Sequence, residues 1–369
     1  MENKKISLLI GIILIIGILA GCGSKTESGN RGVMEGKIVV CQRNYCTGEE
    51  GVLVLDNSGI AMFYDADTDQ YVPLCAKPSC KHETTACAAV SIGGRANWIL
   101  YHDGRLYYDC GENHDLYSAD MDGKNERKIG NFGHNITVSP MIAMNHKLYV
   151  IPNDDTLDEE GYLTAVTTQL LEVNLESGEI RELTEAVKQE IPNDRLIGQY
   201  QDHLYYVDRR ERALYVIDTE TGAKRLEAEN LYQMQAMLSE ELLVYIQYQE
   251  DPKEEILCEK NLKTGETKIL ERRDLEQEEE FCLDYWDNAI KTVSLGTYET
   301  GGLYRWNQMD EFEKIRAFLD DDSFIIKARY GDVLIGESCE KSIPGAAKTT
   351  VESYLSDEIE IQKLERPGK

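Results

Sequence analysis

Residues 203–226 show the clearest alternation of apolar and polar positions in the chain. Tyrosine, valine, isoleucine and leucine alternate with polar residues over His203–Asp208, over Ala213–Asp218 and over residues 223–226. A period of two is typical of a half-buried strand, so this stretch predicts three short antiparallel strands. Residues 219–222 predict the turn of the last hairpin, where Gly222 can adopt a positive φ.

Weaker copies of this unit recur along most of the chain. A polar turn followed by alternating apolar residues occurs at 36–41, 104–109, 146–151, 202–207, 241–246, 288–293 and 331–336. A strand, a tight polar turn and a returning strand alternate with these copies at 62–74, 116–124, 171–179, 214–224, 259–269, 303–310 and 354–364. From Gly178 onward the turns recur about every 44 residues, which is within the range of known repeat proteins.

This repeat length predicts a β-propeller. About four strands in 40–50 residues form one blade, and a blade cannot bury both faces of its sheet unless its neighbours stack around an axis. We therefore predict an all-β fold with a single β-propeller. The hairpin count gives seven blades, although six or eight also fit the spacing. A β-sandwich or two meander domains are the alternatives, but no linker interrupts the repeats.

Three insertions interrupt the period. Residues 153–161 form an acidic stretch that predicts a loop in the third blade, and residues 274–280 form an acidic run before the sixth. Residues 337–354 contain Pro344 and Gly345, and we expect them to include a short helical turn. Insertions in repeat proteins gather on loop faces, where binding often occurs, but a solvated loop is the simpler interpretation of each.

The N-terminus predicts an exported lipoprotein. Lys4 and Lys5 precede a short apolar run, which ends in the sequence Leu-Ala-Gly-Cys at Cys22. A basic start, a short apolar segment and small residues before the cut are typical of a secretory signal. The last four residues resemble a bacterial lipobox, and this resemblance implies cleavage before Cys22 and a lipid on its thiol. We therefore predict a signal peptide at 1–21, a flexible tether at 22–33 and the propeller at 34–366. The protein would then lie on the extracytoplasmic face of the cell membrane, held there by Cys22.

The charge balance narrows the choice of partners. The chain has 39 Lys and Arg against 67 Asp and Glu, a formal net charge of −28. A strongly acidic surface repels phosphate, so we expect no nucleic acid partner and no direct binding to anionic lipid headgroups. Export permits disulfides, but removing Cys22 from the ten cysteines leaves an odd number. At least one thiol is therefore free, bound to metal or paired with another molecule.

The densest group of candidate ligands is Cys75, Cys80, His82 and Cys87. Three sulfurs and one imidazole nitrogen can bind zinc tetrahedrally. The spacing differs from that of the common zinc fingers, so a disulfide that pins the loop, either Cys75–Cys80 or Cys75–Cys87, or plain thiols are favoured over structural zinc. A redox role is not supported, because no Cys-x-x-Cys pair is present.

Together with the lipobox and the repeats, the segment Leu-Cys-x4-Cys-x-His-x4-Cys resembles a family of lipoproteins from Gram-positive anaerobes whose mature part is a TolB-like β-propeller. The resemblance covers nearly the whole chain. It implies the fold and the location, but no catalytic residues.

The remaining motifs favour structural roles. Asp65, Asp67 and Asp69 have the spacing of the start of a calcium loop, but Gln70 replaces the glycine that such a loop needs, so a hairpin turn is predicted. The five histidines outside the cysteine loop are scattered singly, mostly at turns, and we expect them at the surface: His102, His114, His134, His146 and His203. No recognisable local motif for a nucleophile, metalloprotease or phosphate-binding loop is present. No catalytic residue is therefore assigned.

These observations favour a lipid-anchored propeller that binds a protein, peptide or glycan, and a binding role is favoured over an enzymatic one. The alternatives are a propeller hydrolase or lyase that acts on glycans, and a scaffold for envelope assembly. Catalysis would require two or more carboxylates or histidines that converge near the axis.

Overall fold

The computed structural model describes residues 39–365, with gaps at 43, 49, 57, 76, 78, 111–113, 133–140, 158–159, 161–162, 190–193, 277–279, 296–300, 308–310, 318–323 and 339–344. The chain divides into Met1–Glu35 and Gly36–Lys369, and every described residue belongs to the second unit. Cys22 and the predicted signal peptide therefore lie outside the described residues. Within the described part, no helix is both long and apolar enough to span a membrane.

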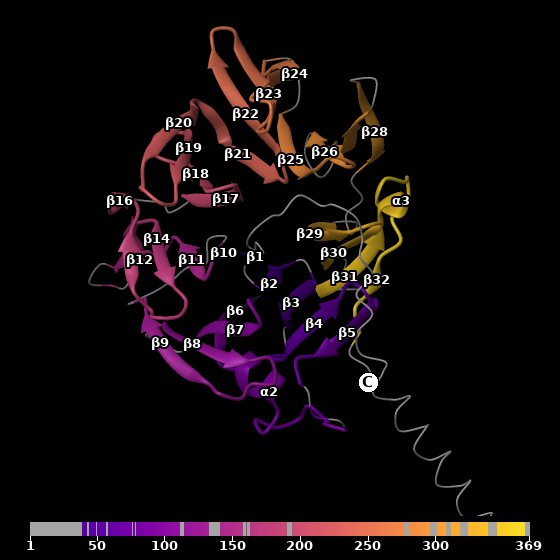
Figure 1. The fold of residues 1–369 in the computed structure, drawn as a ribbon. Helices are drawn as coiled ribbons and strands as arrows, with labels where there is room; N and C mark the ends of the chain where they lie inside the picture. The colour runs from indigo at the N-terminus through magenta and orange to yellow at the C-terminus, as the bar shows by residue number, and fades with distance from the viewer. Residues whose placement is uncertain are drawn as a thin grey trace, which may run out of the picture. The chain divides into compact units, whose positions relative to one another are not determined.

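The second unit is a β-propeller of seven blades, which confirms the predicted fold class and blade number (Figure 1). In each blade the four strands follow one another from the inside of the ring outward. Blades 1 to 3 are formed by β2 Tyr45–Thr47, β3 Gly51–Leu55, β4 Ala61–Asp65 and β5 Gln70–Pro73; by β6 Ala96–His102, β7 Arg105–Cys110, β8 Asp115–Asp120 and β9 Arg127–Asn131; and by β10 Met141–Met144, β11 Lys147–Val150, β14 Leu171–Asn174 and β15 Ile180–Glu182. Blades 4 and 5 are formed by β17 Arg195–Tyr200, β18 His203–Asp208, β19 Ala213–Asp218 and β20 Lys224–Ala228, and by β21 Leu231–Ser239, β22 Leu242–Glu250, β23 Lys253–Asn261 and β24 Thr267–Asp274. Blades 6 and 7 are formed by β25 Phe281–Trp286, β26 Lys291–Leu295, β27 Gly302–Trp306 and β28 Phe312–Ala317, and by β29 Phe324–Tyr330, β30 Val333–Ser338, β31 Gly345–Thr350 and β32 Gln362–Lys363.

Blade 4 has the structure that the alternating pattern predicts. β18 and β19 pair in register from His203↔Asp218 to Asp208↔Ala213. The hairpin turn that follows is closed by the Asp218 carboxylate, which accepts hydrogen bonds from the backbone N–H groups of Glu220 and Thr221. Gly222 has a φ of +73°. The apolar positions of β18 and β19 are buried between neighbouring blades. Successive residues of each strand face opposite sides of the sheet and pack in two different core clusters.

The first repeat copy departs from the prediction. Val39–Gln42 is β1, which is not part of a single blade: it pairs with β10 of blade 3 and with β2 of blade 1. This joins the two blades into one nine-stranded sheet, and Figure 1 shows β1 on the inner side of the ring. The second strand of blade 1 is β3 instead, because its five residues are all buried and supply the apolar strand that this position requires.

Two other segments also differ from the prediction. The acidic stretch begins as a strand, because β12 Asn153–Leu157 pairs with β13 Leu163–Thr168, and β13 pairs with β16 Val187–Gln189. The third strand of blade 7 is β31, whereas the sequence pattern placed it at the start of 354–364. The expected helical turn exists as α3 Val351–Tyr354, which Thr350 caps by accepting a hydrogen bond from Ser353 N–H. A second short helix, α2 Ala88–Gly93, precedes blade 2.

Side chains close the ring between blades 7 and 1. Within the described residues, each of these two blades uses only strands from its own end of the chain. The Tyr330 hydroxyl donates a hydrogen bond of 2.7 Å to the carbonyl oxygen of Gly48, and the ring of Tyr330 packs against Tyr64. Lys348 Nζ lies 2.5 Å from the Asp69 carboxylate. The contact between blades 7 and 1, which we call the seam, is therefore packed and hydrogen-bonded.

Candidate metal centre and inter-blade cavity

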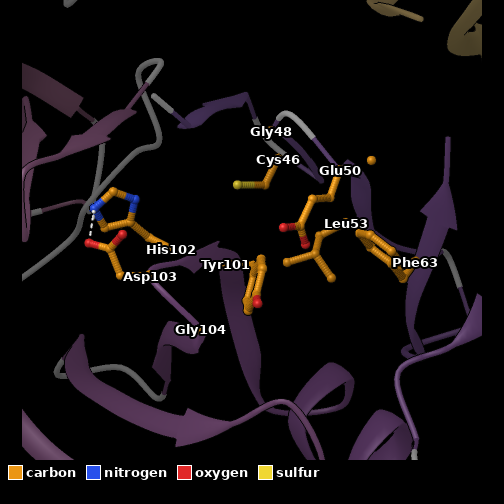
Figure 2. A pocket seen from close by; sticks show the side chains of 10 residues that line it. Cys46, Gly48, Glu50, Leu53, Phe63, Tyr101, His102, Asp103 and Gly104 are labelled. Atoms are coloured by element: carbon orange, nitrogen blue, oxygen red, sulfur yellow. Dashed lines mark ion pairs between the residues drawn. The ribbon is translucent and has the colours of Figure 1, made fainter. Parts of the chain in front are cut away.

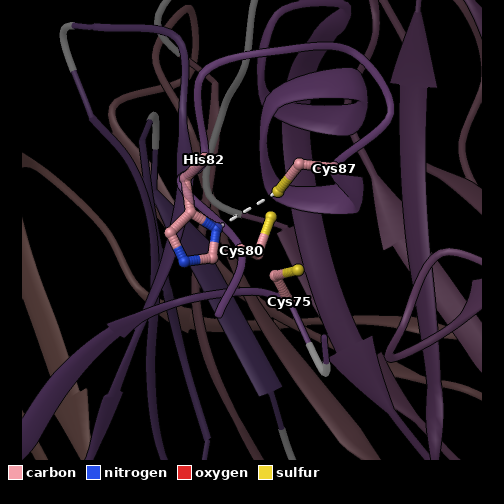
Figure 3. Close-up of side chains that lie close together, drawn as sticks. All are labelled: Cys75, Cys80, His82 and Cys87. Atoms are coloured by element: carbon pink, nitrogen blue, oxygen red, sulfur yellow. Dashed lines mark hydrogen bonds between the residues drawn. The ribbon is translucent and has the colours of Figure 1, made fainter. Parts of the chain in front are cut away.

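The four predicted ligands of the cysteine loop come together in the connection between β5 and α2. One donor atom from each of Cys75, Cys80, His82 and Cys87 lies within 4.8 Å of all the others. Figure 3 shows the three sulfur atoms converging on one edge of the His82 ring. Cys87 is buried, while the other three side chains are half-buried.

The backbone of the loop is shaped to turn these side chains inward. Ser79 and His82 have φ values of +62° and +53°, a left-handed conformation that is uncommon for residues other than glycine. Cys87 N–H donates to the carbonyl oxygen of Thr84, and the Cys87 carbonyl accepts from Ser91 N–H as α2 begins. The helix therefore fixes Cys87, and the two left-handed residues bring Cys80 and His82 back toward it. Such strained residues persist where the surrounding structure holds them.

The thiols differ in their acidity. Burial raises the pKa of Cys75, whereas the backbone N–H of His82 lowers the pKa of Cys80 by hydrogen bonding to its sulfur. His82 Nδ1 lies 3.2 Å from Cys87 Sγ. Cys75, Cys80 and Cys87 are free thiols, so neither of the two disulfides considered from the sequence is formed in this structure.

This donor set suits a tetrahedral cation. Zn–S bonds of about 2.3 Å give a tetrahedral edge of about 3.8 Å, so donors within 4.8 Å need a contraction of about 1 Å to bind zinc. The chemistry also fits, because three thiolates and one neutral imidazole form a Cys3His structural set with no position left for water or substrate. The group can therefore hold a metal ion.

A cavity of about 110 Å³ lies between the inner turns of blades 1 and 2. The turn between β2 and β3 supplies Glu50, the last residue of β6 is His102, and the turn that follows β6 supplies Asp103. Figure 2 shows the Glu50 carboxylate between the side chains of Leu53 and Tyr101. The cavity thus combines an apolar wall with a few polar groups, which is the usual composition of a ligand site.

Two histidines share one carboxylate beside this cavity. Asp103 Oδ2 lies 2.9 Å from His102 Nε2 and 3.0 Å from His146 Nδ1. Burial lowers the pKa of His102, and the positive charge on a protonated His146 lowers it further, although Asp103 acts in the opposite direction. The contact joins blade 2 to blade 3.

The surface assignment of the histidines was wrong at two positions. His102 and His114 are buried, and His114 Nδ1 lies 2.6 Å from the buried Asp109 carboxylate. His134 lies outside the described residues. Sequence reasoning also missed the pairing of His102 with His146, although aligned repeats place both residues at equivalent inner turns of successive blades. Aligning the repeats could therefore have predicted that these two histidines lie near each other.

Two other features of blade 1 are the Asp65 turn and the cysteine at position 46. The Asp65 turn is the β4–β5 hairpin turn that was predicted, because Asp65 accepts hydrogen bonds from the N–H groups of Asp67 and Thr68. Cys46 is disulfide-bonded, and in the β1–β2 ladder its Cα partner is Cys41. The sequence predictions did not single out this position.

No sequence-family profile matches the chain, and no curated protein matches it. Solved structures do resemble it. An oligogalacturonate lyase from Vibrio parahaemolyticus has 14% identity and a TM-score of 0.47, over 85% of this chain and 91% of the lyase. The β-propeller domain of the Trilobed protease from Pyrococcus furiosus has 10% identity and a TM-score of 0.46, over 89% and 96%. A Pyrococcus horikoshii acylaminoacyl peptidase has 12% identity and a TM-score of 0.47, and the chain spans about half of it, with coverage of 89% and 52%. At these identities the likeness concerns the fold alone.

Proposed function

We propose that the protein is a lipid-anchored binding module on the extracytoplasmic face of the cell membrane, with a protein, peptide or glycan as its ligand. The observation that carries the binding role is the cavity between blades 1 and 2, where Glu50, His102 and Asp103 meet an apolar wall. The lipobox at Cys22 supports the location. The disulfide at Cys46 supports it too, because disulfides persist mainly outside the cytoplasm.

The binding role can be tested by photo-crosslinking in membranes of the source cells. The full chain would carry p-benzoylphenylalanine in place of Glu50, at the rim of the cavity, or in place of Glu220, in the exposed outer turn of blade 4. We expect a specific cross-linked product from position 50 and none from position 220. Equal products from the two positions, or none from either, would contradict a binding site at the cavity.

The location is tested separately. Cells that express the full chain would be labelled with a fatty acid analogue and fractionated. We expect the label on the wild-type protein in the membrane fraction, and its loss in Cys22→Ser. Labelling of Cys22→Ser at the wild-type level would reject Cys22 as the lipid site.

A structural zinc ion in the cysteine loop is the second part of the proposal. In an exported protein, three adjacent thiols would be exposed to oxidation, whereas a bound zinc ion holds all three as thiolates. Native mass spectrometry of the full chain should show a gain of about 63 Da, since metal binding displaces protons from the thiols. A loss of about 2 Da would instead indicate a disulfide. Cys75→Ser should remove the zinc, whereas Cys282→Ser, in blade 6, should retain it.

One observation favours a catalytic alternative, a propeller hydrolase or lyase acting on glycans. His102, Asp103 and His146 bring two histidines and a carboxylate together beside the cavity. Against this, Asp103 Oδ2 already contacts both rings, and the His102 side chain is inaccessible to solvent. Turnover of cell-wall or dietary glycans that is lost in His146→Gln would favour the enzyme over the binding module.

A further inference from the structure

The three thiols of the cysteine loop differ in how easily a small solute can reach them. Cys87 is only 2% exposed, and it caps the start of α2, where its backbone N–H and carbonyl groups are both hydrogen-bonded. Cys75 and Cys80 are half-buried, and Cys80 lies between the exposed residues Ser79 and Lys81. A solute from the surrounding water can therefore reach Cys80, whereas Cys87 is shielded.

Two positively polarised groups face the Cys80 sulfur. The backbone N–H of His82 hydrogen-bonds to it, and the Lys77 ammonium lies near enough to attract negative charge on it. Lys77 is itself held in the loop, because its Nζ donates a hydrogen bond of 2.5 Å to the carbonyl oxygen of Ala86. Reactive cysteines occur in partly exposed, electropositive surroundings of this kind. Cys80 is therefore the sulfur of the loop that is placed to react with an electrophile.

A second thiol lies beside Cys80. The sulfur atoms of Cys75 and Cys80 are within 4.8 Å of each other, and Cys80 N–H donates to the carbonyl oxygen of Lys77 in a turn that brings Cys80 back toward Cys75. Cys87 is less free to move, because α2 fixes its backbone and His82 Nδ1 lies 3.2 Å from its sulfur. Cys75 is therefore the thiol that can form a disulfide with Cys80.

From these features we propose that Cys80 is an oxidation site, at which a hydroperoxide converts Cys75 and Cys80 to a disulfide and releases the zinc of the cysteine loop. The inference rests on the structural zinc proposed above and adds the regulation of that site. The sequence argued against a redox role because it contains no Cys-x-x-Cys pair. In the folded loop a longer spacing brings Cys75 and Cys80 together.

The chemistry consumes one hydroperoxide and two protons. The Cys80 thiolate attacks one oxygen of the hydroperoxide, the O–O bond breaks, and one proton is taken up, which gives a sulfenic acid and an alcohol, or water when the oxidant is hydrogen peroxide. The Cys75 thiolate then attacks the Cys80 sulfur, the S–O bond breaks, and the departing hydroxide takes the second proton to form water. The two thiolates lose the two electrons that reduce the peroxide.

The disulfide removes two of the four ligands. Only His82 and Cys87 then remain, which are too few for a closed tetrahedral site, so the loop loses its zinc. Lys77 assists the first step, because one of its N–H groups is taken up by Ala86 and the others can donate to the leaving oxygen. The loop thus has two stable forms, one bound to zinc and one closed by a disulfide.

The first experiment adds hydrogen peroxide in increments to the full chain, purified in a non-ionic detergent with its zinc content measured beforehand. A chromogenic zinc indicator reports the released metal. We expect about one equivalent of zinc to be released per equivalent of peroxide, and a phosphine reductant with added zinc to restore the starting form. Dimedone, which traps sulfenic acids, should label Cys80. Peptide mapping without dimedone should show a disulfide between Cys75 and Cys80.

Variants that keep all four ligands test whether the reaction begins at Cys80. Lys77→Met should bind zinc but release it about threefold more slowly, the size of effect expected from one partly exposed charge. Lys263→Met, in the exposed outer turn of blade 5, should release zinc at the wild-type rate, as should Cys282→Ser, which removes an exposed thiol of blade 6. Equal slowing in the two lysine variants, or loss of release in Cys282→Ser, would overturn the inference.

The remaining outcomes separate this inference from the zinc site on which it rests. A purified chain without zinc would reject the structural zinc and the inference with it. A chain that holds zinc and retains it in excess peroxide would keep the structural zinc and reject only the oxidation site. The same holds if dimedone first labels Cys75 or Cys87, or if the disulfide joins another pair of cysteines.

Discussion

Blade 4 and blade 1 each contain four antiparallel strands, but they differ in what lies outside those strands. In blade 4 the turns are short, and the inner apolar residues pack against the neighbouring blades. Blade 1 gains an extra inner partner, β1, and its outer strand leads into the cysteine loop and α2. It also contributes Glu50, Leu53 and Phe63 to the cavity. The regular blade supplies the frame, and the irregular one carries the groups with specific chemistry.

If blade 1 depends on zinc while blade 4 depends on packing, removal of the metal should lower the free energy of unfolding more than any of the substitutions described below. We expect Cys87→Ser, or treatment with a strong chelator, to reduce the free energy of unfolding by at least about 4 kcal/mol, because structural zinc contributes directly to folding. Urea unfolding of the full chain measures this. Cys282→Ser is the control and should remain sensitive to the chelator. A chelator that leaves the wild-type midpoint unchanged would show that blade 1 does not rely on a metal.

In blade 4 the corresponding change is the loss of a buried side chain. Leu204→Ala creates a cavity in β18, where the side chain is completely buried, and should cost about 3 kcal/mol. Leu226→Ala, at a position with 48% exposure in β20, should cost less than about 0.5 kcal/mol. The Leu204→Ala cost should be the same with and without a chelator. A cost that changes with zinc would mean that the two blades are not independent.

Blade 5 is regular like blade 4, but it contains a buried carboxyl group, Glu255, with a raised pKa. Burial raises the pKa of Glu255 from 4.5 to about 7, and the backbone N–H of Phe281 offsets this only in part. The folded protein therefore retains a proton that the unfolded chain releases between these values. The resulting stability is complete below about pH 4.5 and is lost as the pH rises through 7.

We expect Glu255→Gln to raise the free energy of unfolding by about 2 kcal/mol at about pH 8, and to have little effect at about pH 4.5. Urea unfolding at the two pH values provides the measurement. Glu254→Gln, at the neighbouring and partly exposed position, should show no such pH dependence. If Glu255→Gln destabilises the protein at the higher pH, the carboxylate is ionised and paired in the folded state.

The smallest effects should occur at the seam between blades 7 and 1. Tyr330→Phe removes the hydrogen bond to Gly48, and we expect a cost of about 1 kcal/mol. Lys348→Met should cost less, because the Asp69 carboxylate is 56% exposed and such ion pairs contribute about 0–1 kcal/mol. Thermal unfolding of both single variants and of the double variant would show whether the two contacts act together. A cost above about 3 kcal/mol for either would mean that the seam carries more of the stability than its contacts indicate.

The blades of the propeller could be predicted well because the sequence signals that define a blade are local. Alternation from His203 to Asp218 sets the face of each strand, and Gly222 supplies the positive φ that the turn needs. The pattern failed where an apolar strand has no fixed partner. Val39–Gln42 resembles a second strand, but its pairing with β10 depends on residues about one hundred positions away. Periodicity contains no information about such a pairing.

The candidate sites were predicted only in part, for the same reason. Cys75, Cys80, His82 and Cys87 are close in sequence, so their convergence could be anticipated from spacing. His102 and His146 belong to different blades, and Glu50 meets His102 only because two inner turns are neighbours in the ring. The burial of Glu255 likewise depends on how blades 5 and 6 pack. Only the assembled propeller brings these groups together.

The position of β1 has a mechanical consequence. With the proposed anchor at Cys22, any pull between the membrane and the ring reaches the propeller through Val39–Gln42, the first described strand. Its ladders to β2 and β10 divide that load between blades 1 and 3. Blade 3 would then take up part of the pull, and blade 1, which holds the cysteine loop and half of the cavity, would bear less of it than it would without β10 as a second partner of β1.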